Sequence, residues 1–177
     1  MNDKARVIRH ALMCVLCLGC GILLCAAQTS LLPHYLSDAH LAPDLLLCLT
    51  LCLGVLAGPL YGSLFGIYAG VLADATGGFG IFLLPVFYML CGYGAHVCKE
   101  LLPKQKFPVY AAFGALAALG RAVIAVGYVM LSSGNVELLQ VARYVCLPYV
   151  LGTLLALPIL YPLSLLLTLP IKNINHH

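Results

Sequence analysis

Residues 54–78 read GVLAGPLYGSLFGIYAGVLADATGG and carry a glycine at every fourth position from 54 to 70. The glycines are Gly54, Gly58, Gly62, Gly66 and Gly70, and Asp74 and Gly78 continue the same spacing. Residues four apart in an α-helix lie on one slowly rotating face, so the stretch predicts a helical surface without side chains. Such a surface lets the backbone of a second helix approach closely. We therefore expect these glycines to pack against another helix.

The pair Gly58-Pro59 divides this stretch into two apolar segments, 45–57 and 60–73. Each is about 15 residues, or roughly 22 Å at 1.5 Å per residue, which is short for a hydrocarbon core of about 30 Å. Two short membrane spans, a re-entrant hairpin and one kinked helix are the three possible arrangements.

The basic residues distinguish between these arrangements, because cytoplasmic loops collect Lys and Arg. Two short spans place seven of the nine basic residues on one side, namely Lys4, Arg6, Arg9, Lys99, Lys104, Lys106 and Lys172. One kinked helix would send the last four of them to the other side, so we reject it. A re-entrant hairpin entering from outside gives the same orientation as two spans and stays an alternative. We predict that both termini and residues 99–106 are cytoplasmic, and that residues 37–40 and 132–136 face outward.

The rest of the chain has the composition of a membrane protein. Of its 177 residues 63% are hydrophobic and 8% charged, whereas a soluble domain is about half apolar and a quarter charged. Further apolar runs occupy residues 7–27, 81–98, 109–131 and 141–169. The first run resembles a signal peptide but is longer than a typical one and lacks a clean cleavage pattern, so we expect a retained span. The prediction is one domain, residues 1–177, forming an all-α polytopic bundle of about six transmembrane helices.

Several kinds of site are not indicated by the sequence. The basic residues are scattered at the ends of apolar runs, which argues against nucleic-acid binding. Most of the nine cysteines lie inside apolar runs, and the triplet Cys14, Cys17 and Cys20 has no fourth ligand nearby, so packing is favoured over a metal site. The histidines form no catalytic constellation with a carboxylate and a nucleophile. We therefore expect no metal, no cofactor and no enzymatic activity.

Three charged residues next to or inside apolar runs are candidate functional positions: Asp44, Asp74 and Arg121. Asp44 follows Pro43 at the start of a helix, where a carboxylate suits the positive end of the dipole. Asp74 is either an ordinary polar helix end or a charge that binds a partner or an internal arginine. Arg121 lies near the middle of run 109–131, where an unpaired charge is costly, so we expect it to face the bundle interior or a partner. Asp74 and Arg121 are thus a candidate pair.

Run 109–131 also has small residues at four-residue spacing, Gly114, Ala118 and Ala122. This spacing makes it a candidate neighbour of the glycine face.

The order of residues from Pro43 to His96 resembles MreD, the rod-shape-determining membrane protein family of bacteria. The pattern is Pro43-Asp44, an apolar run, the glycines at 58, 62, 66 and 70, Asp74, then Gly78 and Gly80, and a helix with Gly92 and Gly94. Chain length, the basic start and the six apolar runs are similar as well. The cysteines and Arg121 have no counterpart that the resemblance explains.

This resemblance implies a non-enzymatic scaffold subunit of the cell-elongation machinery in the bacterial cytoplasmic membrane. Its partners would be membrane lipid and the single-span protein MreC, and through MreC the MreB filament and the peptidoglycan synthases. The resemblance also implies a fold similar to the S-components of energy-coupling-factor transporters. A vitamin-binding S-component is the alternative function, and it would need a polar, aromatic-lined cavity opening outside.

Overall fold

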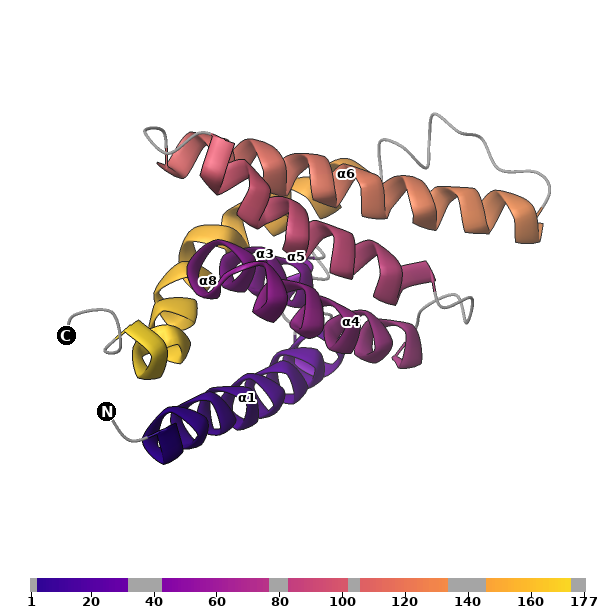
Figure 1. Cartoon of the computed structure of the whole chain (residues 1–177). Coiled ribbons are helices and arrows are strands. Elements are labelled where there is room, and N and C mark those ends of the chain that lie inside the picture. The colour runs from indigo at the N-terminus through magenta and orange to yellow at the C-terminus, as the bar shows by residue number, and fades with distance from the viewer. Residues whose placement is uncertain (1–2, 32–42, 77–82, 102–105, 134–145, 173–177) are drawn as a thin grey trace.

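The computed structural model describes residues 3–31, 43–76, 83–101, 106–133 and 146–172 (Figure 1). Within these ranges the regular structure is helical, which confirms the all-α prediction. The elements are α1 (Asp3–Ala26), the short π-helix η1 (Ala27–Leu31), α3 (Leu45–Ala57), α4 (Pro59–Ala75), α5 (Leu83–Leu101), α6 (Lys106–Ser133) and α8 (Leu147–Lys172). The described residues do not include the predicted outward segment 37–40, residues 134–136 of the predicted outward segment 132–136, residues 102–105 of the predicted cytoplasmic segment 99–106, or Gly78 and Gly80.

Three of the described helices are long and apolar enough to cross a membrane. The qualifying segments are Val7–Ser30, Ala111–Tyr128 and Leu147–Leu169, and Leu45–Ala57 is a shorter apolar helix. Large apolar side chains are exposed on these helices, such as Leu23 on α1 and Val123 on α6, as expected of surfaces that face lipid and not water. The chain therefore has the features of a membrane protein, and the arrangement of six crossings stays a prediction.

A one-residue turn at Gly58 separates α3 from α4. Gly58 has φ +107° and ψ 174°, a conformation that favours glycine, and Pro59 occupies the first turn of α4. The two helices fold back on each other, because a Cβ added to Gly62 would lie 2.5 Å from the Cα of Gly54. The Gly-Pro pair thus makes a helical hairpin, in agreement with the rejection of one kinked helix.

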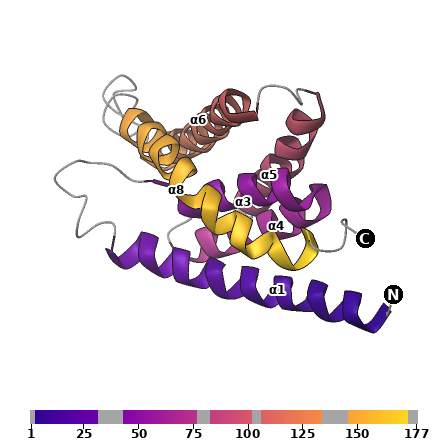
Figure 2. The same ribbon diagram turned by 90° about the vertical axis from the view of Figure 1, so that its left-hand side faces the viewer.

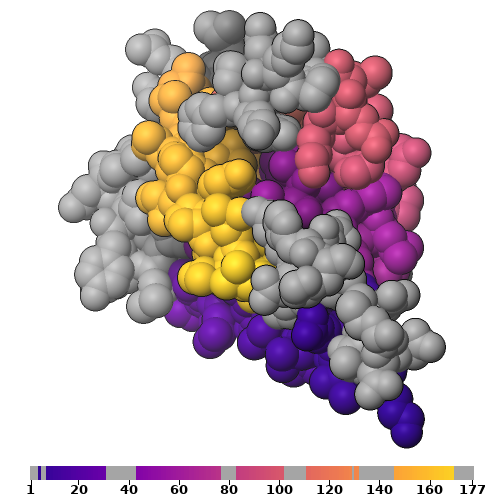
Figure 3. Space-filling view, turned by 60° about the vertical axis from the view of Figure 1, so that its left-hand side comes forward, coloured from indigo at the N-terminus to yellow at the C-terminus, as the bar shows by residue number. Residues whose placement is uncertain are grey.

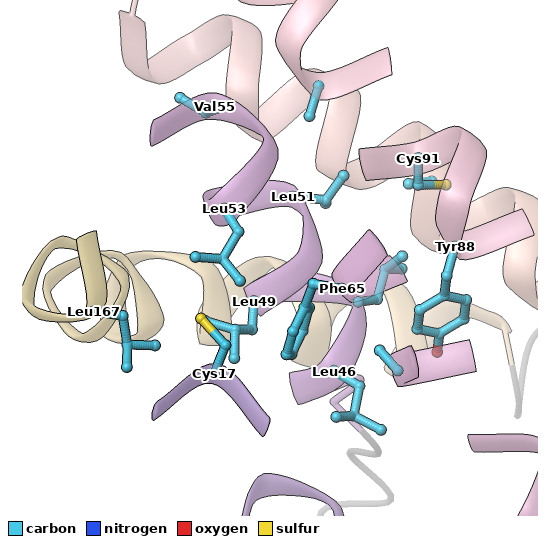
Figure 4. Packing of buried hydrophobic residues seen from close by; sticks show 14 of the residues in the cluster. Cys17, Leu46, Leu49, Leu51, Leu53, Val55, Phe65, Tyr88, Cys91 and Leu167 are labelled. Carbon is cyan, nitrogen blue, oxygen red and sulfur yellow. The ribbon is translucent and has the colours of Figure 1, made fainter. Parts of the chain in front are cut away.

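Helix α3 lies at the centre of the bundle. All of its residues from Leu46 to Val55 are buried, and α4, α5 and α8 are its main neighbours. Figure 4 shows its leucines surrounded by Phe65 from α4, Tyr88 from α5 and Leu167 from α8. A helix that is apolar on all sides is expected to be buried in this way.

Helices α1 and α8 cover this centre from outside (Figures 2 and 3). Two tyrosines of α4 hold α1: Tyr61 stacks on His10 and hydrogen-bonds to it, and the Tyr68 hydroxyl donates to the carbonyl of Leu18 at 2.8 Å. In the space-filling view the surface of α8, in yellow, lies beside the magenta surface of the hairpin and above the indigo surface of α1.

One end of the bundle gathers basic residues. The Lys99 ammonium on α5 donates to the carbonyl oxygen of Val55 in the last turn of α3, at 2.7 Å. Together with the contact between His10 and Tyr61, this places the start of α1, the end of α3, the start of α4 and the end of α5 at the same end. We call it the basic end, after Lys4, Arg9 and Lys99. The last turns of α8 lie there too (Figure 2).

Candidate functional site

Three glycines bring three helices into backbone contact. A Cβ added to Gly62 of α4 would lie 2.5 Å from the Cα of Gly54 in α3 and 2.9 Å from the carbonyl oxygen of Gly92 in α5. A Cβ on Gly54 or on Gly92 would likewise collide with backbone of the adjacent helix. No side chain fits between these helices, and we call Gly54, Gly62 and Gly92 the glycine junction.

The contact continues along α4 toward its C-terminal end. A Cβ on Gly66 would lie 2.5 Å from the carbonyl oxygen of Tyr88, and one on Gly70 would lie 2.6 Å from the nitrogen of Pro85. The partner of the glycine face is therefore α5, with α3 at the junction. Tight packing of Gly54, Gly62, Gly66 and Gly70 is what the sequence led us to expect.

Two expectations about this face are wrong. Run 109–131, now α6, is not the neighbour of the glycine face, because the face contacts the backbone of α5, including Gly92. Gly114 of α6 instead faces Leu157 of α8. Gly58 is not a packing glycine, since a Cβ there would have no atom within 4 Å. Its positive φ makes it the glycine of the turn.

A buried polar cluster lies toward the other end of α3, around Asp44. Asp44 is 2% exposed and caps α3, with Oδ1 accepting from the Leu47 N–H at 3.0 Å. Its Oδ2 accepts hydrogen bonds from the hydroxyls of Tyr88 on α5 and Tyr149 on α8. The Asp44 N–H donates to Thr153 Oγ1 at 3.2 Å. One carboxylate thus connects the start of α3 to two other helices.

Arg121 adds a fourth helix to this cluster. Its guanidinium on α6 interacts electrostatically with Asp44 and with both tyrosines, and it hydrogen-bonds to the Tyr88 side chain. A buried carboxylate is stabilised by a nearby positive charge, and Arg121 supplies one to Asp44. We call Asp44, Tyr88, Arg121 and Tyr149 the polar cluster.

The predicted partner of Arg121 was Asp74, but the carboxylate that the fold brings to the arginine is Asp44. Asp74 lies half-buried in the last turn of α4, a helix that packs mainly on α5 and α3. Asp44 stands at the centre of the bundle because α3 does. The pairing of Asp74 with Arg121 is therefore corrected in favour of Asp44.

Sequence reasoning missed Tyr88 and Tyr149. Both occur in apolar runs, each within two turns of a proline. The available signal was chemical, since a buried tyrosine hydroxyl usually finds a hydrogen-bond partner. Two tyrosines in apolar runs close to the helix starts could have been matched with the aspartate at the start of α3.

The cysteines are free thiols wherever they are described. Cys14 is exposed, Cys17 is buried and Cys20 is half-buried, so the triplet is spread around α1. Within the described ranges no group of three or more His, Cys, Asp or Glu side chains is placed to hold a metal ion.

Comparison with known proteins gives no relative: no family model, no curated protein and no solved structure matches this chain.

Proposed function

We propose that this chain is a non-enzymatic scaffold subunit of the bacterial cell-elongation machinery, similar to MreD, and that it binds an MreC-like single-span protein. Through that partner it would act with the MreB filament and the peptidoglycan synthases. The observation that carries the proposal is the glycine junction. Several of the residues on which the resemblance to MreD rests have a structural role here: Gly62, Gly66, Gly70 and Gly92 bring α4 and α5 into backbone contact, and Asp44 belongs to the polar cluster.

A rigid block of this kind suits assembly better than transport. The hairpin is held to α5 by backbone contacts, and α3 is held to α5, α6 and α8 by the polar cluster. The apolar faces of α1 and α6 remain available for other membrane helices, with Val15 and Leu116 each 65% exposed. Large exposed apolar surfaces inside a membrane are suited to lipid and to partner spans alike.

The proposal includes six membrane crossings in the bacterial cytoplasmic membrane, with both termini in the cytoplasm. The gathering of Lys4, Arg9 and Lys99 at one end supports this orientation. The bond between Lys99 and Val55 also puts the hairpin turn close to that end, which favours two short spans over a re-entrant hairpin. At 1.5 Å per residue, α3 would measure about 20 Å and α4 about 26 Å. Both lengths are shorter than a hydrocarbon core of about 30 Å, so the membrane would have to be thinner around these two helices.

A vitamin-binding S-component is less well supported. Such a protein presents polar groups to a water-soluble ligand, whereas both carboxylate oxygens of Asp44 already accept hydrogen bonds from within the chain. The cavity between α3, α5, α6 and α8 is lined by apolar side chains and lies toward the basic end.

Co-purification tests the proposal directly. Expressed with an MreC-like protein from the same bacterium, the chain should retain it through purification in mild detergent, and depletion of the chain should turn rod-shaped cells round. The Gly62→Leu variant, whose side chain would collide with the backbones of α3 and α5, should retain less of the MreC-like protein. A stoichiometric bound vitamin, detected by mass spectrometry in the absence of any MreC-like partner, would instead establish the S-component function.

A further inference from the structure

An apolar cavity of about 370 Å³ lies between α3, α5, α6 and α8. Val55, Ala95 and Ala111 form its wall at the basic end, and its wall on α8 runs from Leu154 to Tyr161. Two of the four helices, α6 and α8, are long and apolar enough to cross a membrane. Leu155, at the edge of the cavity, is 63% exposed. The cavity therefore opens toward hydrocarbon, and apolar cavities of this kind do not hold water.

The ammonium of Lys99 stands at the basic end of this cavity. Lys99 lies one helical turn beyond Ala95 on α5 and donates to the carbonyl of Val55 at 2.7 Å. Both of these neighbours line the cavity. The Lys99 side chain is exposed, and a lysine ammonium has three donors, so two N–H groups are left to bind an anion beside the cavity.

We propose that the cavity binds one acyl chain of an anionic phospholipid, with the lipid phosphate on Lys99. The eight residues from Leu154 to Tyr161 extend about 10 Å along α8, and this length holds the part of an acyl chain that follows the headgroup. The charge of Lys99 is complementary to the phosphate, and its ammonium is held beside the cavity by the Val55 carbonyl.

The charge at the end of the cavity favours a lipid over a partner helix. The exposed Lys99 ammonium stands beside apolar walls, and an anionic phospholipid carries both an apolar chain for the cavity and a phosphate for the ammonium.

Native mass spectrometry of the full chain tests the site, with dioleoyl phosphatidylglycerol and dioleoyl phosphatidylcholine as probes. Ala111→Leu fills the cavity from α6 and should abolish most retention of both lipids. Ala112→Leu is the matched control, because Ala112 is exposed on the same helix and outside the cavity wall. Lys99→Gln should lower the preference for phosphatidylglycerol by about fivefold, since one basic residue near a membrane surface contributes about 1 kcal/mol. Arg9→Gln, an exposed position at the same end, should keep the preference.

Two results would overturn the proposal. One is equal lipid retention by the Ala111→Leu and Ala112→Leu variants when both keep the melting temperature of the wild type. If Ala111→Leu fails to fold, Leu154→Phe is the second cavity-filling variant and is judged by the same comparison. The other is a Lys99→Gln variant with an unchanged lipid preference.

Photo-crosslinking in native membranes identifies the occupant. With p-benzoylphenylalanine in place of Leu155, we expect an adduct with the mass of a phospholipid. An adduct to polypeptide alone would show that a protein segment fills the cavity and would contradict the lipid site. This experiment does not depend on the elongation partner, so its failure is distinguishable from failure of the proposed function.

Discussion

The glycine junction and the polar cluster fix the same central helix by opposite means. At Gly54 the contact works because side chains are missing, and backbone touches backbone across three helices. At Asp44 the contact works because side chains from three other helices approach one carboxylate. Lipid tails are as apolar as leucine, so burial of apolar surface alone gives helices little reason to associate in a membrane. Close packing and buried hydrogen bonds are the remaining sources of stability. This chain uses close packing at the Gly54 end of α3 and buried hydrogen bonds at the Asp44 end.

The two regions should differ in how they respond to substitution. The junction depends on volume and should be sensitive to any added atom, whatever its polarity. The polar cluster depends on charge balance and should tolerate joint replacement of both charges better than loss of either one.

The largest effect is expected for Arg121→Leu. Loss of the guanidinium leaves Asp44 as an uncompensated buried charge, and breaking a buried pair costs roughly 3–5 kcal/mol. We expect a corresponding drop in the free energy of unfolding in detergent micelles. Because the chain has no tryptophan, unfolding is followed by the reactivity of the buried cysteines toward a thiol reagent.

The double variant Asp44→Asn with Arg121→Leu sharpens this prediction. It should recover part of the loss, because the remaining asparagine is neutral and its one carbonyl oxygen can still accept from the two tyrosines, at the cost of the cap to the Leu47 N–H. Additive losses in the double-mutant cycle would show that the two charges are not coupled.

Gly62→Leu should be the next largest, at roughly 1–3 kcal/mol or more, because overpacking forces the backbones apart. The new Cβ alone would meet the Gly54 Cα at 2.5 Å. Ile67→Leu is the control on the same helix, since Ile67 is 40% exposed and faces away from the junction. Equal melting temperatures for the two variants would contradict the assigned role of the junction.

The same two regions mark how far the sequence could predict the molecule. Glycines at four-residue spacing predict a close helix contact because the spacing is a local property of one helix. The identity of the neighbouring helix depends on the tertiary fold, so the prediction of α6 was wrong and the glycine face packs on α5. Pro43-Asp44 similarly predicted the start of α3, and Arg121 was predicted to face the interior or a partner. The proximity of Asp44 and Arg121 was not predicted, because it depends on α3 lying at the centre of the bundle.

The smallest effect tests a single uncharged hydrogen bond at the edge of the polar cluster. Thr153 Oγ1 accepts from the Asp44 N–H at 3.2 Å and donates to the Tyr149 carbonyl of its own helix at 2.8 Å. Thr153→Val keeps the shape and removes the bond between α8 and α3, which should cost about 1 kcal/mol. Thr168→Val is the matched control: Thr168 is also buried on α8, and its hydroxyl donates to the Leu165 carbonyl in the same helix. Because that helix-internal bond does not join two elements, its loss should leave the melting temperature nearly unchanged. If the two valine variants lose equal stability, the Asp44 backbone bond adds nothing to the cluster, and the charges with the two tyrosines hold α3 in place by themselves.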